Sequence, residues 1–112
     1  MAGVELHRKI IEATVTDGTD QAHLDVIHLS RSSVVGDRTQ FLLGSSPCNP
    51  AAAMADTVLL GVRNFAAAGK AAVVGVPCNT FHAESIFTPF AERVKAEAGD
   101  GVTVLHMLEE TV

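Results

Sequence analysis

The stretch Ala71-Ala72-Val73-Val74-Gly75-Val76-Pro77-Cys78-Asn79-Thr80-Phe81-His82 decides the fold of this 112-residue chain. Its apolar run over residues 71–76 predicts a strand buried on both faces, as in a parallel sheet. Cys78 would then lie at the carboxyl end of that strand, the edge at which open α/β sheets bind ligands. The N–H groups of a following helix would favour a thiolate at this position.

The residues before this stretch predict two helices, a strand and a loop. Apolar residues recur at helical spacing over residues 4–15, and the β-branched, partly alternating segment Leu24–Ser30 predicts a strand. Residues 31–49 form a polar loop, whose length is typical of functional or mobile segments. Asn49-Pro50 predicts a helix start with Asn49 as N-cap, and this helix is expected to run to about Ala68.

The residues after this stretch predict an interrupted helix and a last strand. A helix that begins near Phe81 is expected to break at Thr88-Pro89, because proline cannot continue the hydrogen-bond ladder, and to resume as far as Gly99. Residues 102–107 predict a strand. The order αβαβαβ is typical of a three-layer α/β fold with a parallel sheet, and the length bounds it to a single domain, residues 1–112.

Composition limits the classes of function. Hydrophobic residues make up 47% and charged residues 19% of the chain, which suffices for a core. A net charge of −5 argues against nucleic acid or an anionic membrane surface as a partner. No apolar run approaches a membrane span, and the N-terminus has no apolar leader region. We therefore expect a cytoplasmic protein with reduced thiols.

Each candidate site residue has two interpretations on the sequence alone. Cys78 is either a reactive thiol or a small core residue, and the absence of a Cys-x-x-Cys motif argues against thiol–disulfide exchange. Asn79 and Thr80 could bind a carboxylate or merely cap a helix. His82 could tune the thiol or occupy an ordinary polar helix position. Arg38 could form a bidentate pair with a carboxylate or stay solvated in its loop.

A metal site is the remaining possibility that the sequence offers. Its ligands would be Cys48, Cys78, His82 and His106, but no pair among them has the spacing of a zinc finger. We therefore expect no metal ligands in this chain.

Four motifs occur in an order that points to one family. They are Asp20-Gln21-Ala22-His23, Asp37-Arg38-Thr39, Val76-Pro77-Cys78-Asn79-Thr80-Phe81-His82 and Leu105-His106-Met107-Leu108-Glu109-Glu110-Thr111. Together they resemble the first half of the aspartate/glutamate racemase family, and residues 4–13 resemble the family's first helix. The resemblance covers nearly the whole chain.

The resemblance implies a flavodoxin-like half-domain and a racemase that uses neither pyridoxal phosphate nor a metal. In that family two cysteines flank the α-carbon of an amino acid, one removing the α-proton and the other protonating the opposite face. Cys78 would be one of the two. Asn79 and Thr80 would hold the α-carboxylate, and Arg38 would pair with a side-chain carboxylate. His82 and His106 are candidate supporting residues.

The sequence also departs from the family's pattern. The family's glycine-rich first strand and its second half, which carries the partner cysteine, have no counterpart in these residues, so we expect a chain truncated at both ends. Unpaired sheet edges would then favour homo-oligomers. Aspartate, glutamate and other substrates of the wider superfamily, such as hydantoins and arylmalonates, remain open. The alternative function is a non-catalytic module that binds an amino acid or dicarboxylate, or another protein.

Overall fold

The computed structural model describes residues 2–110, which adopt a mixed α/β structure that is mostly helical. The short 3₁₀ helices are labelled η. In chain order the elements are α1 (Ala2–Ala13), η1 (Asp20–Ala22), α2 (Arg38–Leu42), α3 (Ala51–Ala67), β1 (Ala72–Val74), η2 (Thr80–His82), α4 (Glu84–Ala98), η3 (Gly99–Gly101), β2 (Val102–Val104) and α5 (Met107–Glu110).

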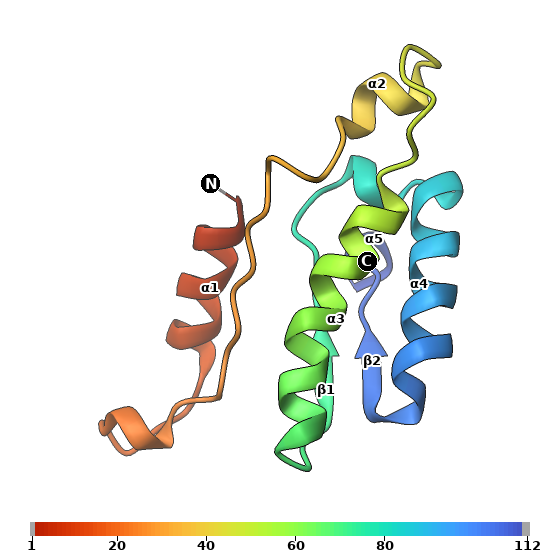
Figure 1. Cartoon of the computed structure of the whole chain (residues 1–112). Coiled ribbons are helices and arrows are strands. Elements are labelled where there is room, and N and C mark those ends of the chain that lie inside the picture. Colours follow the sequence, from red (N-terminus) through yellow and green to blue (C-terminus); the bar gives the residue numbers. More distant parts are fainter. Residues whose placement is uncertain (1, 111–112) are drawn as a thin grey trace.

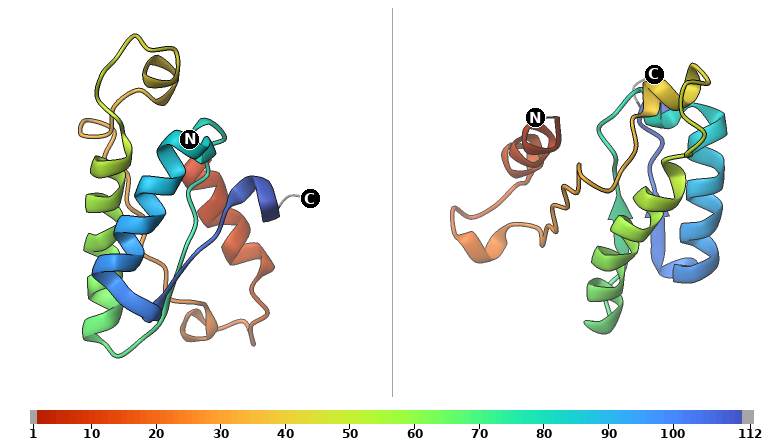
Figure 2. Two further views of the ribbon diagram at one scale, coloured as in Figure 1. Left: turned by 90° about the vertical axis from the view of Figure 1, so that its right-hand side faces the viewer. Right: turned by 45° about the horizontal axis from the view of Figure 1, so that its top comes forward.

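The sheet consists of two parallel strands. β1 pairs with β2 so that Ala72 lies opposite Val102 and Val74 opposite Val104. α4 forms the connection between the strands, as parallel pairing requires. Figure 1 shows α3 and α4 side by side next to the strands, and Figure 2 shows α1 apart from them on the other side.

The core lies where α3, α4 and the residues after β1 meet. Phe81 and Phe90 are fully buried, and their rings pack edge to face with centroids 4.9 Å apart. Burial of aromatic and branched side chains supplies most of the stability of a small domain. The buried members of this cluster are Ala51, Ala55, Val76, Phe81, Ile86, Phe90 and Val94.

The N-terminal part of the chain, residues 2–49, extends the molecule but contributes no buried residue to the core. α1 has no buried residue, and Val4 and Ile11 of its apolar face are 63% and 47% exposed. The radius of gyration is 14.9 Å, whereas a compact chain of this length has about 13 Å. The molecule is accordingly elongated, with extents of 49 × 29 × 27 Å.

The helices predicted over residues 4–15 and 50–68 are confirmed as α1 and α3, within two residues at each end. α3 and α4 both end before glycines with a positive φ of 73°, Gly69 and Gly99, a conformation that other residues adopt only with strain. Within residues 2–110, no helix is both long enough and apolar enough to cross a membrane.

The expected break at Thr88-Pro89 is wrong, because Pro89 lies inside α4. The interruption falls earlier, at Ala83, whose ψ of 138° is extended. Proline has no N–H to donate to the carbonyl four residues before it, which here belongs to Ser85. The side chain of Asn49 donates to that carbonyl instead, at 2.9 Å, and its oxygen accepts from the N–H of Ala51 at 2.9 Å. Asn49 therefore compensates for Pro89 and helps to begin α3.

The expected order αβαβαβ is also wrong for the described residues. Residues 24–30 form no strand, because no described neighbour pairs with their backbone. The last strand ends at Val104 rather than at Met107, which begins α5. The long loop contains α2, capped by Asp37, whose carboxylate accepts from the N–H of Gln40 at 3.0 Å. Thr111, the end of the last motif, lies outside the described residues.

Candidate functional site

The backbone after β1 presents the thiol of Cys78 at the carboxyl end of the sheet. The chain turns at Pro77, and the N–H of Cys78 donates to the carbonyl of Val76 at 2.9 Å. The thiol lies 3.3 Å from the hydroxyl of Thr80, within hydrogen-bond distance for sulfur. Cys78 is partly buried and free of any disulfide. A thiol at this position is both accessible and held by a neighbouring hydroxyl.

Opposing influences set the pKa of Cys78. Burial raises the pKa, because it disfavours the charged thiolate. The hydroxyl of Thr80 and the backbone N–H of Phe81 donate to the sulfur and lower the pKa. The guanidinium of Arg38 lowers it further through its charge and a hydrogen bond. The net result is a pKa below the ordinary value of a thiol, which increases the thiolate fraction at neutral pH.

Arg38 reaches this thiol from a distant part of the sequence. It is the first residue of α2, and α2 packs against η2, which follows Cys78. The structure thus brings Arg38, Cys78 and Thr80 together. Asn79 is exposed at the start of η2, where its side chain makes no capping hydrogen bond and its carbonyl accepts from the N–H of His82 at 3.1 Å.

His82 is buried, so the polar helix position considered for it is wrong. Only 3% of the residue is exposed. Its Nδ1 lies 2.7 Å from the carbonyl oxygen of Cys78, and because a carbonyl can only accept, Nδ1 carries the proton. The imidazole therefore positions the main chain at Cys78 rather than the sulfur. Its Nε2 is buried and has no hydrogen-bond partner among the described residues.

His106 follows β2 and packs against the same aromatic group. Its ring centroid lies 4.8 Å from that of His82 and 4.6 Å from that of Phe87. Its Nδ1 accepts a hydrogen bond from the N–H of Glu109 at 3.3 Å, so a neutral His106 carries its proton on Nε2. The two histidines thus pack in one group with Phe87. This contact joins residues that are distant in the sequence, so the sequence around each histidine does not reveal it.

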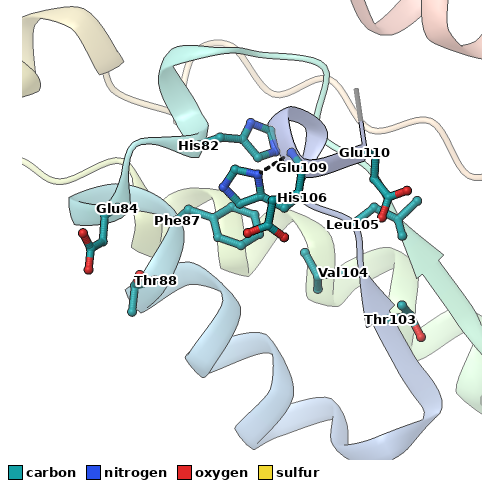
Figure 3. A pocket seen from close by; sticks show the side chains of 10 residues that line it. All are labelled: His82, Glu84, Phe87, Thr88, Thr103, Val104, Leu105, His106, Glu109 and Glu110. Atoms are coloured by element: carbon teal, nitrogen blue, oxygen red, sulfur yellow. Dashed lines mark hydrogen bonds between the residues drawn. The ribbon is translucent and has the colours of Figure 1, made fainter. Parts of the chain in front are cut away.

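An open cavity of about 530 Å³ lies beside these histidines, as Figure 3 shows. His82, His106 and Phe87 line it, together with the carboxylates of Glu84, Glu109 and Glu110. Cys78, Asn79, Thr80 and Arg38 do not line it. The predicted site residues therefore fall into two groups, a thiol group and a cavity group, with His82 between them through its bond to Cys78.

Sequence reasoning missed several members of both groups. The N–H of Phe81 acts on the thiol through the backbone, which no side-chain pattern can reveal. Phe87 and Glu84 had no signal beyond their positions in a predicted helix, and Glu109 and Glu110 occurred only as part of the last motif, with no role assigned to them. Cys48 is exposed and free, at the end of the long loop.

Within residues 2–110, no three His, Cys, Asp or Glu side chains are placed to hold a metal ion together. No family model matches the chain, and neither a curated protein nor a solved structure shows significant similarity to it.

Proposed function

We propose that this chain carries one acid/base half of a cofactor-independent amino-acid racemase site, with Cys78 as the proton-transfer group. The observation that carries the proposal is the thiol at the end of a parallel strand, with a pKa lowered by Thr80, Phe81 and Arg38. The proposal includes a flavodoxin-like half-domain and a reducing, cytoplasmic compartment, in which this thiol remains free.

The chemistry assigned to Cys78 is removal of an α-proton. The thiolate takes the proton, the α C–H bond breaks, an S–H bond forms, and the electron pair left on carbon is delocalised into the α-carboxylate. Such a carbanion requires fixed donors near the carboxylate. We assign the α-carboxylate to Asn79 and Thr80 and a side-chain carboxylate, as in aspartate, to Arg38.

Inversion additionally requires an acid on the opposite face of the α-carbon. The chain has one other cysteine, Cys48, which is exposed. The thiol can return the proton, or a solvent deuteron, to the face from which it was taken. Exchange of the α-proton is therefore the reaction to test first.

The experiment follows the α-proton of L- and D-aspartate by NMR in heavy water. We expect loss of that signal with the unmodified chain and with Cys48→Ala, and no loss above background with Cys78→Ala. Thr80→Val should slow exchange, because it removes a donor to the thiolate. Equal exchange by Cys78→Ala and Cys48→Ala would overturn the assignment.

The second candidate is a non-catalytic module that binds a carboxylate. It is favoured by the position of the thiol group outside the cavity lined by His82 and His106, since a base that is open to solvent is poorly protected from water. This candidate predicts that aspartate binds without exchange, and that calorimetry shows weaker binding for Arg38→Gln but not for Cys78→Ala.

A further inference from the structure

Two extended segments of this molecule have unpaired backbone edges. Residues 24–30 make no main-chain hydrogen bond with any other described residue, and their segment joins no sheet. β1 is paired with β2 along one edge only. Figure 1 shows both segments rising in the same direction.

Both segments pack against α3 on one face. A Cβ placed on Gly61 of α3 would lie 3.2 Å from Cδ1 of Leu29 and 3.6 Å from Cγ2 of Ile27. α3 also packs on β1, where Ala72 is buried. The two extended segments thus share the layer beneath α3.

Both segments also contact α1 on the opposite face. The ring of His28 lies 5.6 Å from that of His7, centroid to centroid. A Cβ on Gly75, just after β1, would lie 3.9 Å from Cδ2 of Leu6. Since side chains alternate between the faces of an extended segment, these contacts place residues 24–30 and β1 in one layer between the same two helices.

The free edge of β1 can be assigned from its ladder. The carbonyl of Val74 accepts from the N–H of Leu105 at 2.9 Å, so the polar groups of Val74 face β2. In a parallel strand the residues on either side present their N–H and C=O groups to the other edge. Val73 and Gly75 therefore direct their backbone groups away from β2, and Val73 is 69% exposed.

The surface area of the chain indicates a large uncovered region. The accessible surface is 7374 Å², whereas a compact protein of 11.7 kDa exposes roughly 5900 Å². The excess of roughly 1500 Å² exceeds the ~800 Å² that each partner contributes to a standard interface. The excess is therefore large enough for a further polypeptide segment to bind to this surface and bury it.

We infer that residues 24–30 and the free edge of β1 together accept one β-strand from a separate polypeptide, parallel to β1. Such a strand would satisfy backbone groups along both edges, as in β-strand addition. Because α1 and α3 cover the two faces, its side chains must be uncharged and apolar in both directions. The edge of the sheet and the exposed face of α1 would become buried in the same step.

The probe for this surface is the peptide acetyl-Thr-Val-Ile-Val-Ile-Val-Lys-Lys-amide. We expect it to bind, and to slow hydrogen exchange both in residues 24–30 and at Val73 and Gly75. The same peptide with N-methylated valines keeps the side chains but loses donors toward one of the two edges, so it should bind at least about tenfold more weakly, the effect of losing a hydrogen bond. Equal binding of the two peptides, or protection confined to β2, would overturn the inference.

A matched pair of variants tests the edge itself. Val73→Pro removes an N–H that has no partner within residues 2–110, whereas Val73→Thr retains the N–H and the branched shape. We expect weaker peptide binding for Val73→Pro and unchanged binding for Val73→Thr. Ile27→Pro, compared with Ile27→Val, tests the opposite edge in the same way, because residues of this segment that face α3 direct their N–H groups toward β1. It replaces Val73→Pro if that variant fails to fold by circular dichroism.

A second copy of this chain is the competing occupant. It would protect the same amides without peptide, in proportion to the protein concentration, and would sediment as a dimer. That result would overturn the assignment to a separate polypeptide.

Discussion

Residues 2–49 and residues 50–110 both contain apolar residues at regular spacing, but they differ in how far those residues are buried. Every buried residue of the described chain lies within residues 50–110, and none lies within residues 2–49. The N-terminal part nevertheless contains an amphipathic helix and an apolar extended segment. Apolar patterning therefore sets the local conformation in both parts, but only the C-terminal part provides the neighbours that bury it.

The difference teaches how the N-terminal part depends on contacts. A helix of 12 residues such as α1 is marginally stable alone in water. α1 is supported by an exposed network in which Arg8 pairs with Glu5 and Glu12, and such pairs contribute little to stability. We expect this part to open locally far more easily than the core of α3 and α4.

The largest expected effect comes from truncation in the packed part. Phe90 is fully buried against Phe81, so Phe90→Ala should lower the free energy of unfolding by about 3–5 kcal/mol in urea titrations. The matched change in the N-terminal part is Ile11→Ala, for which we expect a loss of less than ~0.5 kcal/mol. A comparable loss in both variants would show that α1 is packed in solution and would remove the contrast.

An intermediate effect should follow from Asn49, the residue at the boundary between the two parts. Asn49→Ala loses both the donor to Ser85 and the acceptor for Ala51, and should cost about 1–2 kcal/mol of unfolding free energy. Asn49→Asp keeps only the acceptor and should recover part of that loss. Asn64→Ala, in an exposed stretch of α3, serves as the control. If Asn49→Asp matches the unmodified chain, the bond to Ser85 contributes nothing.

The helices were predictable because their signals are local. The spacing of apolar residues and the glycines at positions 69 and 99 determine α1, α3 and the end of α4 without reference to the rest of the chain. The absence of a strand over residues 24–30 could not be predicted in the same way. A strand requires a hydrogen-bonded neighbour, and the pattern of a segment cannot say whether one is present.

The candidate site shows the same distinction between local contacts, which the sequence predicts, and contacts between distant segments, which it does not. Cys78 and Thr80 are two residues apart, so their contact follows from a single turn of the chain. The approach of Arg38 depends on how α2 docks on η2, for which the residues themselves carried no signal beyond the family resemblance. The break before α4 was misplaced because Asn49, which is distant in the sequence, compensates for Pro89.

A smaller effect is expected on the pKa of the Cys78 thiol, which residues from both parts of the molecule lower. The rate of Cys78 alkylation follows the thiolate, so in a Cys48→Ala background it should rise with pH through a midpoint below that of N-acetylcysteine amide. Thr80→Val, within the packed part, should shift the midpoint upward. Arg38→Gln should shift it upward by less, since Arg38 reaches the thiol from the loosely packed part. A larger shift for Arg38→Gln would show that α2 is firmly docked.

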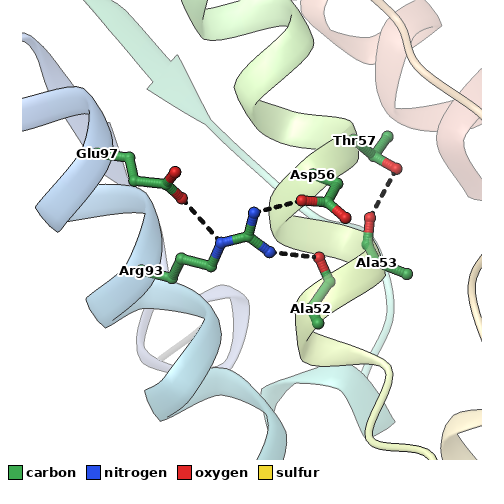
Figure 4. Close-up of polar contacts among 6 residues, drawn as sticks. All are labelled: Ala52, Ala53, Asp56, Thr57, Arg93 and Glu97. Carbon is green, nitrogen blue, oxygen red and sulfur yellow. Dashed lines mark hydrogen bonds and ion pairs between the residues drawn. The ribbon is translucent and has the colours of Figure 1, made fainter.

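The smallest effect compares two arginine networks, one in each part. Figure 4 shows Arg93 of α4 bonded to Glu97 on its own helix, to the carboxylate of Asp56, and to the carbonyl of Ala52 at 3.0 Å, so it joins α4 to α3. Arg8 bonds only to carboxylates of α1 among the described residues. An intrahelical ion pair on an exposed surface is screened by salt, whereas a hydrogen bond to a carbonyl across two helices persists.

We therefore expect Arg93→Ala to lower the melting temperature more than Arg8→Ala does. Added salt should reduce the difference between Arg8→Ala and the unmodified chain to nothing, and should leave a residual difference for Arg93→Ala. Arg93→Lys retains the charge but not the geometry that reaches three acceptors, so it should resemble Arg93→Ala at high salt. If salt abolishes the effect of Arg93→Ala as well, the contact with Ala52 does not bind the helices together. The stability of the packed part would then come from its apolar core alone.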